Sequence, residues 1–167
     1  MKISIVYVSQ TGNTETAAEY IQDGILAKFP FIQVKPMDIR ENEVDLEFLD
    51  QSDVVIFGTP VYFTGMSWEL KKWFDHSTRI NLNGKLGAAF VTAQSPTGGT
   101  DTAVMDVIRH MLVKGMLAFS GAGRGFQIGA VGLARDMEGS GSQLEAFGAN
   151  VAETALKLFE GGTFKKK

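Results

Sequence analysis

Apolar and polar residues alternate in blocks along this chain, and the blocks predict strands and helices in turn. Short apolar runs rich in β-branched residues are typical of strands buried on both faces of a sheet. Such runs occur at residues 2–8, 31–37, 53–58, 86–91 and 116–119. Apolar residues at helical spacing lie between and after them, and predict helices within residues 17–29, 43–49, 68–74, 101–113 and 143–159.

The order of these elements is a strand followed by a helix, repeated five times. Strands that alternate with helices indicate a parallel sheet with helices on both faces. We therefore predict a single α/β domain, residues 1–167, built as a three-layer sandwich. A glycine-rich stretch, residues 121–141, precedes the last helix, and residues 121–126 within it are predicted to be loop.

The composition limits the chemistry available to this domain. The 167 residues include no cysteine, which excludes disulfides, thiolate nucleophiles and cysteine-ligated metals. The two histidines, His76 and His110, lack metal-ligand spacing, so no metal site is predicted. The net charge of −3 argues against a nucleic-acid partner, which normally requires a basic surface. Because we find neither a signal peptide nor an apolar run of about 18 residues, we expect a cytoplasmic protein without membrane insertion.

The loops after the first, third and fourth strands have unusual compositions. They cover residues 9–14, 59–65 and 92–100. In an open α/β sheet, ligands bind outside the carboxyl ends of the strands, near the point where the strand order reverses. We therefore expect these three loops to form one ligand site.

The first loop predicts a phosphate site. It consists of Ser9, Gln10, Thr11, Gly12, Asn13 and Thr14. Hydroxyl and amide groups stand directly before a helix, where unpaired N–H groups and the helix dipole favour a phosphate. The loop contains no lysine or arginine, so neutral donors alone would hold the anion, which suits a terminal monophosphate. Simple capping of the helix by Ser, Thr or Asn is the alternative interpretation.

The other two loops suit a planar ring. The loop after the third strand offers apolar and aromatic surface through Pro60, Val61, Tyr62, Phe63, Thr64 and Gly65. The loop after the fourth strand is rich in hydroxyls and glycine, which allows backbone to approach a ligand closely. Its candidate site residues are Thr92, Ala93, Gln94, Ser95, Gly98 and Gly99.

Two of these motifs resemble a known family. The spacing S-x-T-G-x-T, at residues 9–14, resembles the phosphate-binding signature of flavodoxins. The stretch G-T-P-V-Y-F-T-G-M-S, at residues 58–67, is similar to the corresponding loop of NAD(P)H:quinone oxidoreductases of the tryptophan-repressor-binding-protein type. The resemblance implies a flavodoxin-like parallel sheet of order 2-1-3-4-5. It also implies FMN as cofactor, with its phosphate on the first loop and its ring between the other two, where Phe63 is expected to touch it.

The sequence departs from that family in two places. The third loop carries no tyrosine or tryptophan, so we expect no aromatic sandwich around the ring. Lys114 occupies the position where the quinone reductases typically carry a histidine that faces the flavin.

Two functions follow from these observations. The first, which the aromatic-poor third loop and the weak net charge favour, is an enzyme that passes electrons from NAD(P)H through FMN to a quinone-like acceptor. The second is a flavodoxin-type electron carrier that serves protein partners. By family precedent we also expect a homo-oligomer, with residues 76–84 at the subunit contact.

Overall fold

The computed structural model describes residues 1–40, 44–121 and 127–161. Its strands are β1 (Lys2–Tyr7), β2 (Gln33–Asp38), β3 (Val54–Tyr62), β4 (Gly65–Met66), β5 (Leu86–Ala93), β6 (Leu117–Ala118) and β7 (Ala130–Leu133). Its helices are α1 (Asn13–Lys28), α2 (Leu46–Asp50), α3 (Trp68–His76), α4 (Thr100–Val113) and α5 (Met137–Phe159). Residue 43, where the short helix at 43–49 was predicted to begin, lies outside the described residues. Helix α2 begins later than predicted, at Leu46, because the Asp45 carboxylate caps it by accepting the Phe48 N–H. No described helix is both long enough and apolar enough to cross a membrane.

The sheet confirms the predicted parallel order. Its strands follow the order β2-β1-β3-β5-β6, and β7 also pairs in parallel with β5. The fifth strand therefore consists of two pieces. The first piece, β6, pairs with the start of β5 at Leu86, and the second, β7, pairs with its end from Phe90 onward. Strand β7, within the glycine-rich stretch, was not predicted, because a four-residue strand with an internal glycine gives no strand signal of its own. The loop predicted at residues 121–126 lies, apart from Gly121, outside the described residues.

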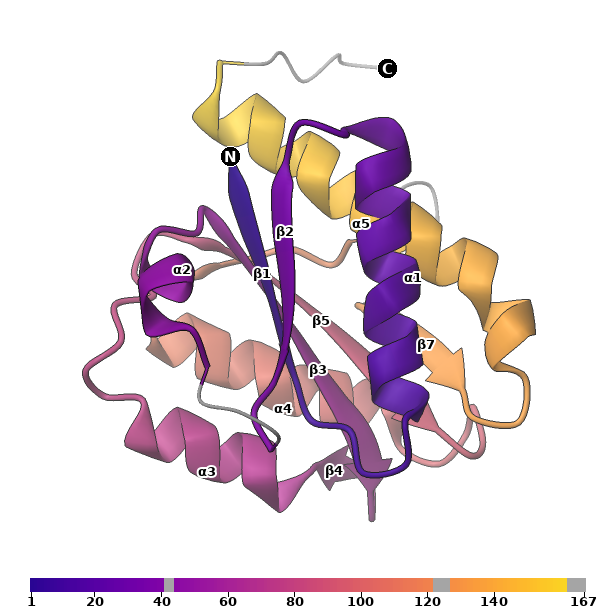
Figure 1. The fold of residues 1–167 in the computed structure, drawn as a ribbon. Helices are drawn as coiled ribbons and strands as arrows, with labels where there is room; N and C mark the ends of the chain where they lie inside the picture. The colour runs from indigo at the N-terminus through magenta and orange to yellow at the C-terminus, as the bar shows by residue number, and fades with distance from the viewer. Residues whose placement is uncertain (41–43, 122–126, 162–167) are drawn as a thin grey trace.

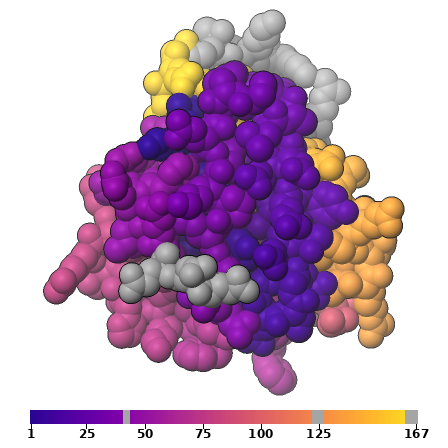
Figure 2. Space-filling view, in the orientation of Figure 1, coloured from indigo at the N-terminus to yellow at the C-terminus, as the bar shows by residue number. Residues whose placement is uncertain are grey.

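Two layers of helices cover the sheet (Figure 1). Helices α1 and α5 bury one face together with Ile3 and Ile5 of β1. Helices α3 and α4 bury the opposite face together with Val6 and Val8, which follow on the same segment. Each fully buried aliphatic side chain of this kind stabilises the fold by about 1.5–3 kcal/mol. In Figure 2 the N-terminal third of the chain forms most of the face that includes α1 and β2.

The last helix begins earlier than the sequence predicts. We expected it at residue 143, but α5 starts at Met137, and the Asp136 carboxylate caps it by accepting the Gly139 N–H at 3.0 Å. The glycines and serines of residues 139–142 hide the helical periodicity. Glycine is needed where α5 packs on α1: a methyl group at Gly141 would lie 2.9 Å from the Tyr20 ring. A methyl group at Gly148 of α5 would lie 2.3 Å from the Ile21 carbonyl oxygen of α1.

The carboxyl ends of β1, β3 and β5 lie together at one edge of the sheet, opposite the N-terminus and the end of α5 (Figure 1). Two of these strands are longer than predicted. Strand β3 continues to Tyr62 and β5 to Ala93, so the beginnings of the second and third loops are extended strand. This extension fixes the backbone of the residues that line the site.

An ion-pair network joins α1 to α5 and makes stability depend on pH. Lys28 and Lys157 both donate to the Glu153 carboxylate at 2.5 Å. They lower the Glu153 pKa from 4.5 to about 2, with Lys157 as the larger cause. A lowered carboxyl pKa contributes stability above the unfolded value, and this contribution is lost as the pH falls from about 4.5 to about 2.

We predict that Glu153→Gln lowers the free energy of unfolding at pH 7 by about 1 kcal/mol or less, since the pair is partly exposed. Urea unfolding at pH 7 and at pH 2 measures this. The matched control is Glu19→Gln, an exposed position of α1 that has no ion pair within the described parts of the chain. An equal difference between wild type and Glu153→Gln at both pH values would contradict the role given to this network.

Candidate functional site

A cavity of about 150 Å³ lies at the carboxyl edge of the sheet. Its lining comes from all three predicted loops and from the segment after β7: Gln10, Thr11, Asn13, Thr14, Pro60, Val61, Tyr62, Thr92, Ala93, Gln94 and Ala134. The structure thus brings together ten of the residues singled out from the sequence. Ala134 was missed, because β7 was not predicted.

The start of α1 leaves N–H groups available to a ligand. The N-cap is Gly12, whose φ of 85° lies in the left-handed region that favours glycine, and no side-chain hydrogen bond is made from this position. The first backbone N–H of α1 that donates to a backbone carbonyl one turn earlier is that of Thr16, which bonds the Gly12 carbonyl at 2.9 Å. The N–H groups of Asn13 and Thr14 precede that point and have no carbonyl within the helix to bond.

The side chains of the first loop divide into structural and accessible groups. The buried Ser9 hydroxyl accepts the Glu15 N–H at 3.3 Å, so part of the capping that we considered as the alternative does occur. The buried Thr14 hydroxyl bonds that of Thr92 at 2.8 Å and ties the loop to β5. Thr11 is exposed and accepts a hydrogen bond from Asn13 at 3.0 Å. Thr11 is therefore the hydroxyl that a ligand reaches with the least structural change.

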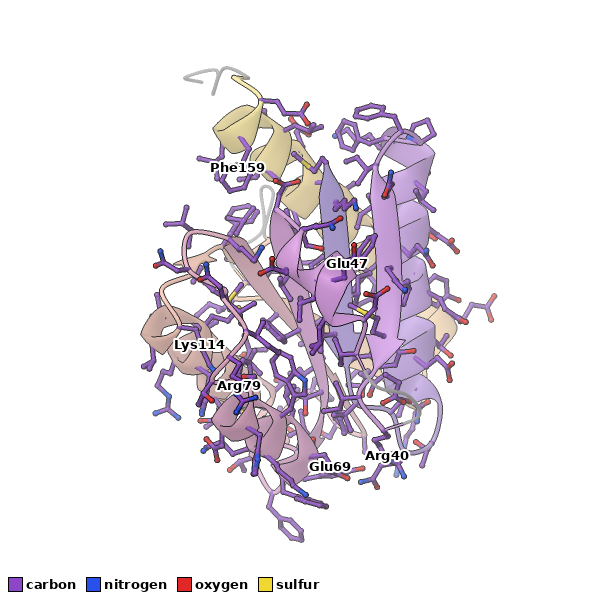
Figure 3. All side chains as sticks on the ribbon, turned by 60° about the vertical axis from the view of Figure 1, so that its left-hand side comes forward. Arg40, Glu47, Glu69, Arg79, Lys114 and Phe159 are labelled. Atoms are coloured by element: carbon purple, nitrogen blue, oxygen red, sulfur yellow. The ribbon has the colours of Figure 1, made fainter. Side chains whose placement is uncertain are left out.

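Two charged residues that the sequence analysis missed support this loop. The Arg40 guanidinium donates to the Ser9 carbonyl at 2.8 Å, from the segment after β2. The Gln10 amide donates to the Glu69 carboxylate at 2.6 Å, at the start of α3. Figure 3 shows Arg40 and Glu69 near the same lower edge of the molecule. The first loop contains no lysine or arginine, but the Arg40 guanidinium bonds its backbone from a neighbouring segment. Sequence reasoning could not find this contact because 31 residues separate Arg40 from Ser9.

The second loop is a tight hairpin between β3 and β4. Tyr62 pairs with Gly65, so Phe63 and Thr64 form the turn, with φ values of 46° and 71°. Positive φ is costly for a large or β-branched residue, on the order of 1–3 kcal/mol. The buried Thr59 hydroxyl holds the base of the hairpin by accepting the Ser67 N–H at 2.9 Å.

The hairpin separates two aromatic side chains. Tyr62 lines the cavity, whereas the Phe63 side chain is fully exposed, at 104% of its reference area. Thr64 and Gly65 do not contribute to the lining either. The contact predicted between Phe63 and a flavin ring stays a prediction, and the structure places Tyr62 nearer to the cavity.

The Tyr62 phenol stays protonated well above neutral pH. Partial burial raises its pKa and the nearby Glu69 carboxylate raises it further, against an opposing effect of Arg40. At neutral pH this side chain therefore offers an O–H donor and an uncharged ring at the cavity wall.

Only the start of the third loop reaches the cavity. Thr92, Ala93 and Gln94 line it, while Ser95 and Gly98 lie beyond in a turn closed by a 3.2 Å hydrogen bond between their backbones. Gly99 has a φ of 91°, and a methyl group there would lie 2.5 Å from the Cα atom of Thr64. Glycine at this position allows the third loop to pack against the strained hairpin.

Lys114 does not face this cavity, which corrects the position given to it by the resemblance. Helix α4 runs from the carboxyl edge of the sheet to the opposite edge, and Lys114 ends it there. Its ammonium group donates to the Ser77 carbonyl at 3.0 Å and to the Ser77 hydroxyl at 2.9 Å. Figure 3 shows it well away from Arg40 and Glu69. Within this chain Lys114 anchors the end of α3.

The chain matches the family described as having a flavodoxin-like fold over residues 1–138. A flavodoxin from Clostridium saccharobutylicum is 43% identical over 164 residues, which cover 95% of this chain and 100% of that protein. An NAD(P)H dehydrogenase (quinone) from Gluconacetobacter diazotrophicus is 30% identical over 146 residues, or 75% of this chain and 73% of that protein. The crystal structure of a WrbA-like flavodoxin from Agrobacterium tumefaciens superposes with a TM-score of 0.77 at 24% identity, covering 93% of this chain and 98% of the other.

This chain belongs to the flavodoxin-like family, and FMN is its cofactor. The cavity agrees with that cofactor. It combines the unpaired N–H groups of a helix start, suited to a phosphate, with tyrosine and aliphatic side chains, suited to a flavin ring. Among the described residues, no cluster of three or more His, Asp or Glu side chains could hold a metal ion.

The division of roles in the first loop leads to a prediction. Thr11→Val should weaken FMN binding by about 1.5–3 kcal/mol, the contribution of one hydrogen bond to a charged group. That corresponds to roughly a 10- to 100-fold rise in Kd. Riboflavin affinity should be unchanged, because riboflavin has no phosphate. Flavin fluorescence titrations of apoprotein measure both affinities.

The control is Thr97→Val, which removes an exposed hydroxyl of the third loop that bonds only Ser95. Thr14→Val should weaken both flavins, since it also breaks the bond to Thr92. Equal loss of FMN and riboflavin affinity in Thr11→Val would contradict the placement of the FMN phosphate at this loop.

Proposed function

We propose that this chain is a flavodoxin-type electron carrier that holds FMN at the carboxyl edge of its sheet and exchanges electrons with protein partners. In this proposal the FMN phosphate lies at residues 9–14, and the flavin ring lies between the segment 60–62 and the segment 92–94. The bound FMN supplies the redox chemistry, and the chain supplies binding, orientation and electrostatics.

The observation that carries this proposal is similarity along the whole chain. The Clostridium flavodoxin is matched over its entire length at 43% identity. By contrast, the alignment with an NAD(P)H dehydrogenase (quinone) from Acidovorax ebreus runs over 198 positions at 28% identity, which exceeds the 167 residues of this chain. Part of that dehydrogenase therefore has no counterpart here. The sequence alone favoured the enzyme, through the aromatic-poor third loop and the net charge of −3, and the full-length similarity outweighs that argument.

The protein groups around the cavity have distinct roles in this proposal. The N–H groups of Asn13 and Thr14 and the Thr11 hydroxyl would bind the phosphate. Arg40 would reduce the electrostatic cost of the anion from behind the loop, through its bond to the Ser9 carbonyl. Tyr62 would contact the ring as a neutral phenol.

An exposed aromatic rim beside the cavity supports a role in binding proteins. Tyr62 is 38% exposed, Trp68 is 65% exposed, and Phe63 is fully exposed on its strained turn. Aromatic side chains are enriched at protein interfaces, where they contribute most of the binding energy. Backbone strain is kept where surrounding structure enforces it, commonly at functional sites. We infer that the hairpin presents Phe63 to the redox partner.

An NAD(P)H:quinone oxidoreductase is the second candidate. It is supported by the Gluconacetobacter relative and by the third loop, whose cavity-lining residues Thr92, Ala93 and Gln94 include no aromatic ring. A nicotinamide or quinone would then stack on the flavin face beside these residues. In that case a neighbouring subunit, contacting residues 76–84, would complete the site.

Reduction of the flavin by nicotinamide nucleotides separates the two candidates. For a carrier, we expect NADH and NADPH not to bleach the visible absorbance of the FMN-loaded protein within minutes. The photoreduced protein should nevertheless pass electrons to cytochrome c. If NAD(P)H bleaches the flavin rapidly and is turned over with benzoquinone, the proposal of a carrier is wrong and the protein is an oxidoreductase.

The role given to Phe63 is tested by a truncation. Phe63→Ala should slow electron transfer to cytochrome c several-fold in stopped-flow experiments, because partner contact is lost. FMN affinity should change less than twofold, since the Phe63 ring lies outside the cavity, and a larger loss would support the flavin contact predicted from the sequence instead. The matched control is Phe31→Ala, which removes a 66% exposed ring between α1 and β2, at the opposite edge of the sheet. Equal transfer rates in both variants would contradict the docking role.

A further inference from the structure

A second and larger cavity adjoins the flavin site. Its volume is about 490 Å³, and its lining consists of Ile39, Arg40, Trp68, Glu69, Lys72, Trp73 and His76. Five of these residues come from α3, and the other two come from the segment after β2. Ligand sites in proteins commonly have volumes of 300–1,000 Å³. The Gln10–Glu69 hydrogen bond lies between this cavity and the flavin site, since Gln10 lines one and Glu69 the other.

Both tryptophans of the chain line this cavity. Trp73 is fixed by ring contacts with Phe57 at 5.7 Å and Phe74 at 5.4 Å, so it forms a rigid part of the wall. Trp68 is 65% exposed and has the Lys72 ammonium 5.7 Å from its ring centroid. A large exposed indole beside a cation is suited to stacking with a planar ring.

The charges around the cavity favour an anion. The Arg40 guanidinium donates one N–H to the Ser9 carbonyl and makes no other hydrogen bond with the described residues, while the Arg40 backbone N–H donates to the Asp38 carboxylate. Lys72 forms no ion pair within the same part of the chain, and its ammonium group lies over the Trp68 ring. Among the described lining residues, Glu69 is the one carboxylate, and its Oε1 atom accepts a hydrogen bond from Gln10. Two available cations therefore face one carboxylate.

The Glu69 carboxylate also requires a hydrogen-bond donor. Its Oε1 atom accepts from Gln10 at 2.6 Å, but its buried Oε2 atom has no hydrogen-bond partner among the described residues. A buried acceptor left unpaired costs about 1–3 kcal/mol or more. An N–H or O–H group of a bound molecule would remove that cost.

From these contacts we propose that this cavity binds a purine nucleotide. The base would stack on the indoles, the phosphate would pair with Arg40 and Lys72, and a base amine or sugar hydroxyl would donate to Glu69. This inference does not rest on the carrier function. It places the nucleotide on Arg40 and Glu69, whose side chains bond Ser9 and Gln10 of the first loop, so the two sites are joined by these hydrogen bonds.

The two indoles allow this site to be observed directly. In ¹⁵N-labelled, FMN-loaded protein they give the only two indole N–H signals. Titration with AMP should move both signals with a single saturating Kd. Adenosine should bind at least tenfold more weakly, because it lacks the phosphate, and inorganic phosphate alone should leave the Trp73 signal in place.

Variants of neighbouring lysines test the charge contribution. Lys72→Ala should weaken AMP at least tenfold. The matched control Lys71→Ala should have no effect, because Lys71 pairs with Asp75 and does not line the cavity. FMN affinity should be the same in both variants.

No shift of either indole at millimolar AMP would overturn the proposal, as would an equal response of Lys72→Ala and Lys71→Ala. Either result would leave the carrier function intact. Conversely, if NAD(P)H reduces the flavin and AMP also binds as expected, the proposed carrier function is wrong while the proposed nucleotide site is supported.

Discussion

The site depends on the unpaired N–H groups at the start of α1. A helix cannot satisfy its first N–H groups internally, and here the N-cap is a glycine without a side chain to offer. Because β1 delivers this helix start to the carboxyl edge of the sheet, next to the ends of β3 and β5, the unpaired groups open into a cavity rather than into bulk solvent. The Ser9 hydroxyl and the Arg40 guanidinium hold the loop from the protein side, which keeps the donors directed to the ligand side.

Much of the architecture was predictable from the chain because its strands are buried on both faces. The apolar runs of β1, β3 and β5 carry a strong local signal, and the alternation with helices leaves few sheet topologies. The site followed from that topology, since ten predicted residues meet in one cavity. The match to the flavodoxin-like family supplies the cofactor, which no periodicity reveals.

The parts that sequence reasoning missed depend on contacts between distant residues. Strand β7 exists because β5 offers an unpaired edge from Phe90 onward, and nothing within its own four residues indicates a strand. Arg40 and Glu69 join the site through hydrogen bonds to residues 31 and 59 positions away. Lys114 was placed by resemblance, and the direction of α4 carries it to the opposite edge. In each case local composition could not show which partner a side chain would meet.

We propose above all that the first N–H groups of α1 bind the FMN phosphate. The backbone amide protons of Asn13 and Thr14 report on this contact directly. In NMR spectra of ¹⁵N-labelled apoprotein, saturation with FMN should shift these two amide protons strongly downfield, as expected for hydrogen bonds to a phosphate. Saturation with riboflavin should leave both near their positions in the apoprotein. The same shifts with both flavins, or none with FMN, would contradict the account.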